Sequence, residues 1–177
     1  MSAEPSTDGL WGCAKCARIT QTCCQRAEVL TTAADRARIA AFTGWSDFWE
    51  YRAPESPSYT DQDDDPNWIH WGFRPDGTRP ILKRRLGGDC VFLSPTGCAL
   101  PMDIRPLVCR LYPYTYNEQG IDGIDNGCPP EVIPPGSNIL TVLDMRRAEA
   151  DQWHAALYRE LREGCDAKRL ASPAPAA

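Results

Sequence analysis

CAKCARITQTCC, residues 13–24, places four of the nine cysteines of this 177-residue chain within twelve positions. Thiols this close together form a disulfide knot, a redox dithiol or a metal site. The chain opens with MSAEPSTDGLWG, which lacks the basic segment and apolar run of a secretory signal, so we expect a cytoplasmic protein. Thiols are kept reduced in that compartment, where clustered cysteines are more often metal ligands or redox groups than disulfides.

The spacing within the stretch bears on these alternatives. Cys13 and Cys16 form a C-x-x-C pair, which can hold one metal or close a small disulfide. A thioredoxin-like dithiol would follow a strand, and nothing before Cys13 has the pattern of one. Cys23 and Cys24 are adjacent, and neighbouring side chains point in different directions on a helix or a strand. We therefore expect these two thiols to serve different sites, or one to bind metal while the other supports it.

Further cysteines stand singly along the chain, at Cys90, Cys98, Cys109 and Cys128. With the cysteines of the stretch they supply enough thiols for two four-thiolate sites, or for one site with spare thiols. Arg105 and Arg110 flank Cys109, and we predict that their guanidinium groups offset the thiolate charge and donate hydrogen bonds to sulfur. Cys165 follows the last predicted helix and is interpreted as a free thiol.

The same spacing bears on the identity of the metal. Zinc sites usually show two close pairs of ligands, and this chain has one C-x-x-C pair. Single ligands on loops, and a Cys128-Pro129 step like the Cys-Pro of bacterial ferredoxins, favour an iron–sulfur cluster of the 4Fe-4S type. Zinc is the alternative, because both centres accept four-thiolate shells.

The expected fold class is α+β: a small metal-nucleated domain of short helices and hairpin strands joined by long irregular loops. We place this single domain at residues 11–165, between a flexible N-terminus over residues 1–10 and a disordered tail over residues 166–177. Apolar residues recur near helical spacing from Leu143 to Leu161, which predicts a C-terminal amphipathic helix over 137–163 that ends at Gly164. The other predicted elements are a helix from Thr31 or Thr32 to Gly44, a short helix after Ser46, short strands over 79–100, a short helix over 103–113 and an irregular segment over 120–130.

Composition and motifs exclude several classes of function. The net charge of −5 argues against a nucleic-acid or anionic-membrane partner, and no apolar run is long enough to span a bilayer. The chain has no Walker A, G-x-G-x-x-G, G-x-S-x-G or H-E-x-x-H motif. The basic segment RPILKRR is interpreted as a solvated strand face. The acidic run DQDDDP is interpreted as a solvated loop, because Pro66 stands where a calcium loop needs glycine.

The cysteine pattern as a whole resembles a known family. C-x-x-C followed by Cys-Cys, then GDCVFLSPTGCAL, IRPLVCRLYPY and Cys128, resembles the YkgJ-type cysteine-cluster family, a zinc- or iron-chelating domain. Flagellin lysine-N-methylases are similar, longer proteins that carry the same cluster. The resemblance covers residues 11–130, places the family's two arginines on Arg105 and Arg110, and implies these metal ligands: Cys13, Cys16, Cys23, Cys24, Cys90, Cys98, Cys109 and Cys128. The six residues ARITQT before the Cys-Cys pair are a longer spacing than is usual in the family.

Three hypotheses about function follow. The first is a small cytoplasmic metal-binding protein that holds an iron–sulfur cluster, or zinc, and has a redox or accessory role. The second is a zinc-stapled interaction module whose Trp-rich surface recognises a protein partner. The third is a protein-modifying enzyme related to flagellin lysine-N-methylase, although the sequence has no glycine-rich loop to hold a methyl donor. The predicted ligand is a metal ion or cluster, with no nucleic-acid and no membrane partner.

Overall fold

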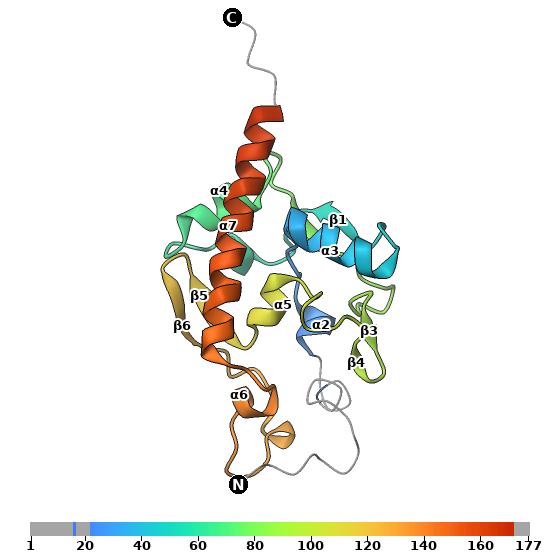
Figure 1. Cartoon of the computed structure of the whole chain (residues 1–177), viewed down its shortest axis with the longest axis vertical. Helices are drawn as coiled ribbons and strands as arrows, with labels where there is room; N and C mark the ends of the chain where they lie inside the picture. The colour runs from blue at the N-terminus through green and yellow to red at the C-terminus, as the bar shows by residue number, and fades with distance from the viewer. Residues whose placement is uncertain (1–15, 17–21, 172–177) are drawn as a thin grey trace, which may run out of the picture.

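The computed structural model describes Cys16 and residues 22–171, and it has the predicted α+β architecture (Figure 1). Two-stranded antiparallel sheets are joined to short helices, and one long helix, α7, stands upright in Figure 1. Residues 1–10 and 172–177, for which flexible ends are predicted, lie outside the described residues, as does Cys13. In the described part of the chain, no helix is both long and apolar enough to cross a membrane.

Helix α3, Ala33–Thr43, confirms the helix predicted from Thr32 to Gly44. The Thr32 hydroxyl accepts the N–H of Asp35 at 2.9 Å, and the Asp35 carboxylate accepts the N–H of Thr32 at 2.9 Å. This reciprocal pair satisfies two backbone donors that the first turn of a helix leaves free. Gly44 then ends the helix in the left-handed conformation, with φ 69°.

The short helix predicted after Ser46 is wrong. Trp49–Arg52 form strand β1, which pairs antiparallel with strand β2, Arg79–Leu82. Strand β2 is buried at every position, and its Ile81 also bridges to Leu30 on the other side. Because the buried backbone of β2 needs hydrogen-bond partners, sheet pairing overrides the local helical pattern of the aromatic segment.

The remaining strands form two small hairpins. Strand β3, Leu93–Ser94, pairs with β4, Gly97–Cys98, inside the region predicted to hold short strands. Strand β5, Tyr114–Asn117, pairs with β6, Gly120–Ile124. The segment from residue 120 is therefore a strand at its beginning and not irregular throughout. The glycines of this segment interrupt the alternation of side chains that predicts a strand. The hairpin is held in place by Tyr116 and Ile121, which pack against the main core.

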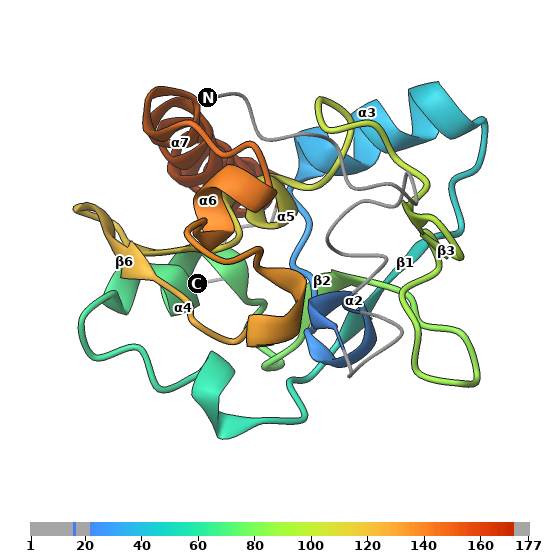
Figure 2. The same ribbon diagram turned by 90° about the horizontal axis from the view of Figure 1, so that it is seen from below.

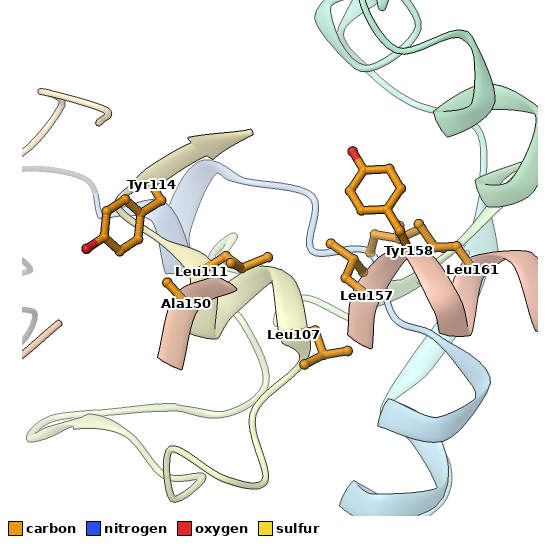
Figure 3. Packing of buried hydrophobic residues seen from close by; sticks show 8 residues of the cluster. Leu107, Leu111, Tyr114, Ala150, Leu157, Tyr158 and Leu161 are labelled. Atoms are coloured by element: carbon orange, nitrogen blue, oxygen red, sulfur yellow. The ribbon is translucent and has the colours of Figure 1, made fainter. Parts of the chain in front are cut away.

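The main hydrophobic core lies along helix α7, Arg147–Ala171 (Figure 3). Helix α5, Leu107–Leu111, confirms the short helix predicted over 103–113 and packs on α7, as does helix α4, Pro66–Gly72. Figure 3 shows the buried side chains that meet there, which are Leu107, Leu111, Tyr114, Ala150, Leu157, Tyr158 and Leu161. The position of α5 is thus set by apolar contacts with α7 that do not involve a thiol.

The C-terminal helix begins later than predicted. A separate one-turn helix α6, Ile139–Val142, comes first, and the chain then turns at Asp144, whose φ is 51°. A residue with positive φ cannot continue a right-handed helix, so the apolar repeat from Leu143 onward is split between two elements.

The same helix also ends later than predicted. It continues through Gly164 to Ala171, so residues 166–171 are helical and do not belong to a disordered tail. A glycine inside a helix costs only about 1 kcal/mol relative to alanine. Burial of Leu161 and Cys165 on either side of the glycine stabilises the helix past this point.

A second hydrophobic core surrounds the cysteine-bearing segments. Its buried members are Ile39, Phe48, Leu82, Cys90, Phe92, Leu93 and Leu100. Cys24, on the one-turn helix α2 (Cys23–Arg26), packs against this core together with Cys98 of strand β4. Two 3-10 turns, Pro57–Tyr59 and Pro130–Val132, complete the described elements. Seen from below in Figure 2, α5 lies between α2 and α7.

Candidate metal centre

The two central cysteine-bearing segments are tied together by backbone contacts. The N–H of Cys90 donates to the carbonyl of Cys24 at 2.7 Å. In helix α2 the side chain of Gln25 accepts the N–H of Thr22 at 3.0 Å and donates to Asp89 at 3.1 Å. Cys23 and Cys24 are thereby fixed against Cys90, although the two segments lie far apart in the sequence.

Arg84 adds further hydrogen bonds between the Cys23–Cys24 segment and the Cys90 segment. Its Nη1 donates to the carbonyls of Gln25 at 2.7 Å and Gly88 at 2.8 Å, and its Nη2 donates to the carbonyl of Ala27. Two of these carbonyls belong to the end of α2, where backbone acceptors have no partner within the helix, and the third belongs to the turn before Cys90. One half-buried guanidinium therefore joins both segments.

Cys109 is positioned by helix α5. The carboxylate of Asp35, fully buried in helix α3, accepts the N–H of Leu107 at 3.1 Å. Asp35 also forms an ion pair with Arg38. Burial raises the pKa of Asp35, while its hydrogen bond to Thr32 lowers it. The first turn of α5 is thus attached to α3, and the Cys109 thiol keeps a defined position.

Five thiols line one large cavity of about 340 Å³: Cys23, Cys24, Cys90, Cys98 and Cys109. The rest of its wall is largely apolar, with Phe92, Leu93 and Leu100 from the second core and Trp68 and Tyr116 from the region of α4 and β5. Arg105 also lies in this wall. Such a cavity brings soft sulfur ligands to one place and limits access of water to them.

A second, much smaller cavity of about 20 Å³ is lined by Cys16, Cys23 and Cys128. The Tyr112 hydroxyl and the Cys128 thiol form a hydrogen bond of 3.2 Å at its edge. Burial and this hydrogen bond raise the pKa of Tyr112. Arg26 also lines the cavity, so a cation stands beside the thiols.

The thiols influence one another's ionisation. The pKa of Cys23 is lowered to about 7, chiefly by a hydrogen bond from the Cys24 thiol and to a smaller extent by the charge of Arg26, while burial acts in the opposite direction. Burial raises the pKa of Cys109 well above its usual range, and the thiols of Cys90, Cys23 and Cys98 raise it further. Burial and the neighbouring Cys128 likewise raise the pKa of Cys16. Thiols gathered in this way lose their protons together only when a cation compensates the charge.

The donor set fits a thiophilic metal. All described cysteines are free thiols, and thiolates are the ligands that both zinc and iron–sulfur clusters accept. In the described part of the chain, no three His, Cys, Asp or Glu side chains already stand at the spacing that one metal ion requires. The thiols line cavity walls, and coordination would draw their side chains inward. Cys165 lies apart on α7, where its thiol is 3.7 Å from the carbonyl of His70.

The two predicted arginines lie in different surroundings. Arg105 lines the large cavity and its Nε donates to the carbonyl of Leu100 at 2.9 Å. Arg110 is buried, and its Nε donates to the carbonyl of Arg105 at 2.8 Å while a terminal nitrogen donates to the carbonyl of Asp103. Arg110 therefore holds the backbone that precedes α5, and the offset of thiolate charge by either arginine stays a prediction.

Sequence reasoning missed Arg84, because RPILKRR was interpreted as a solvated strand face. The alternation of side chains between the two faces of a strand could have revealed the role of Arg84. Leu82 faces the second core, so Arg84, two residues later, points to the same side while Lys83 points outward. A cation on the buried side of a strand end, shortly before a cysteine, marks a residue that supports the site.

Replacing Arg84 provides a test of this connection. Arg84→Ala leaves three carbonyls without their donor, and we expect affinity for the bound metal to fall about tenfold to a hundredfold, as for other residues that orient metal ligands. Competition with a chelator measures the affinity. Lys83→Ala is the matched control, since Lys83 forms a surface ion pair with Asp47 at 2.5 Å. Equal affinities in the two variants would show that Arg84 does not support the site.

Comparison with known proteins agrees with this geometry. A family model described as "CxxCxxCC: Putative zinc- or iron-chelating domain" matches residues 12–129, which include every cysteine except Cys165. No curated protein and no solved structure matches the chain. The matched range contains every cysteine that lines the two cavities and covers more than half of the sequence, so the chain belongs to this family of zinc- or iron-chelating domains.

Proposed function

We propose that this protein holds an iron–sulfur cluster, of the 4Fe-4S type, through its clustered cysteines and serves a redox or accessory role in the cytoplasm. The ligands are drawn from Cys13, Cys16, Cys23, Cys24, Cys90, Cys98, Cys109 and Cys128. Metal binding itself follows from membership of the family. The type of centre and the biological role are the proposal.

The observation that carries the proposal is the convergence of thiols. Seven of the eight described free cysteines, from segments far apart in the sequence, line the two cavities. Free thiols rarely gather for packing alone, because each needs only an apolar environment and has no preference for sulfur neighbours. Soft ligands collected from several segments are the arrangement that a cysteine-ligated metal requires.

Three features favour an iron–sulfur cluster over zinc at the large cavity. Its volume of about 340 Å³ far exceeds the space of a single ion. Its thiols come from four places in the sequence, namely α2, the segment at Cys90, β4 and α5, which suits a cluster whose irons each take one cysteine. Its apolar wall, with Phe92 and Leu100, provides the low dielectric through which a protein sets a cluster's reduction potential.

The experiment is purification without oxygen, followed by an absorption spectrum and measurement of iron, sulfide and zinc per chain. A brown protein with equal iron and sulfide is the expected result. A colourless protein with stoichiometric zinc would show that the centre is zinc and not a cluster, and the conclusion that the protein binds metal would stand. A protein that retains neither metal, and takes up neither on reconstitution, would contradict the proposal.

A zinc-stapled interaction module is the second candidate. The observation that favours it is the exposure of large apolar side chains: Phe42 is 54% and Trp45 40% exposed at the end of α3. Exposed aromatic side chains are common in surfaces that bind proteins. The related protein-modifying enzyme is a third candidate, and calorimetric titration with a methyl donor tests it.

A further inference from the structure

We infer that the cysteines form two separate metal centres, divided between the adjacent residues Cys23 and Cys24. The larger centre is held by Cys24, Cys90, Cys98 and Cys109. The smaller centre takes a single thiophilic ion through Cys16, Cys23 and Cys128. The inference rests on the proposed function and adds the number of centres and the share of each cysteine.

The composition of the two cavity walls supports this division. Cys24, Cys90, Cys98 and Cys109 line only the large cavity and make a complete four-thiolate set. Cys16 and Cys128 line the small cavity and not the large one, and Cys128 also borders a third cavity of about 360 Å³. Cys23 lines both, so it is the one thiol whose assignment the cavity walls leave open.

The geometry of helix α2 assigns Cys23 to the small centre. Successive side chains on a helix diverge by about 100°, so Cys23 and Cys24 can face different cavities even though their thiols share a hydrogen bond. Cys24 packs against the second core together with Cys90 and Cys98, which directs its thiol to the large cavity. Cys23 then directs its thiol toward Cys16 and Cys128.

The two cavities differ in the kind of centre that they admit. About 10–15 Å³ of such volume is enough for one water molecule, so the small cavity of about 20 Å³ has room for a single ion. Its outer residues suit a thiolate-bound ion, because the Tyr112 hydroxyl is 3.2 Å from the Cys128 sulfur and Arg26 provides positive charge. The large cavity has no such limit of size.

The test compares Cys24→Ser with Cys23→Ser in the full chain, purified without oxygen. Iron, sulfide and zinc per chain are measured for the wild type and both variants. We expect Cys24→Ser to lose the larger centre and keep the single ion, and Cys23→Ser to keep the larger centre and lose the ion. The double variant should lose both. Cys165→Ser is the control for a general effect of removing a thiol.

A second pair of variants guards against local unfolding of α2. Cys98 lies on a hairpin and Cys128 on a loop, so neither substitution touches α2. We expect Cys98→Ser to lose only the larger centre and Cys128→Ser to lose only the single ion, each in a chain whose circular dichroism matches the wild type. Loss of all metal in equal proportion from both members of either pair would overturn the division into two centres. So would a wild type that holds one centre only, which would leave the proposed function intact. A wild type without metal would overturn the proposed function as well.

Discussion

Cys109→Ser is expected to lose the metal held at the large cavity, which is at least half of the bound metal, whereas Cys165→Ser should keep the wild-type amount. The substitution replaces a soft sulfur by a hydroxyl, which is a poor ligand for zinc or an iron–sulfur cluster. Helix α5 should not move, because Asp35 binds its first N–H at 3.1 Å and its Leu107 and Leu111 pack on α7. The measurement is metal per chain after passage through a chelating column.

The comparison with Cys165→Ser is informative because both cysteines lie on helices that contribute to the same core region. Cys165 is buried, and its thiol is 3.7 Å from the carbonyl of His70, away from both cavities. A merely structural loss of a thiol would affect both variants alike. Equal metal content in the two variants would contradict the assignment of Cys109 as a ligand.

Removal of the metal is expected to destabilise the cysteine-bearing segments more than helix α7. A ligand present at a thousand times its Kd stabilises a folded protein by about 4 kcal/mol, and that contribution disappears in the metal-free protein. The segments around Cys23 and Cys90 are short and are joined to each other by few hydrogen bonds. Helix α7 has a long apolar contact with α4 and α5.

Amide hydrogen exchange measures this difference. After removal of the metal under reducing conditions, we expect protection to fall most in residues 22–30 and 90–100 and least in residues 150–161. Protein kept under the same reducing conditions with its metal is the control for the treatment. Uniform loss of protection along the chain would show that metal binding and the main core form one cooperative unit.

Local chemistry in the sequence predicts part of the fold. The Thr32 cap and Gly44 delimit α3, because each acts through its own backbone and a hydrogen bond three residues away. Strand β1 could not be predicted in this way, since its conformation depends on a partner strand about thirty residues later. The end of α7 was equally hidden, because Gly164 is tolerated only where neighbouring side chains are buried.

The residues of the candidate site also differ in how far the sequence alone predicts them. A cysteine is a visible candidate whatever the fold, so Cys24, Cys90 and Cys109 could be predicted as ligands before their positions were known. The residues that hold them are visible only in space. Arg84 acts through carbonyls of α2, and Asp35 through the first N–H of α5. The local pattern shows at most that Arg84 faces inward, because the atoms that Arg84 and Asp35 contact lie 59 and 72 residues away in the sequence.

The contact between α2 and the segment at Cys90 has a consequence for synthesis. Cys16, Cys23 and Cys24 leave the ribosome before the other ligands, and Cys109 and Cys128 follow only after about a hundred further residues. At a translation rate of about 5–20 residues per second, the first thiols wait several seconds without their later neighbours. Metal loading is therefore a late event that completes the domain, and the nascent chain passes through an interval in which its early thiols are exposed to oxidants and to competing metals.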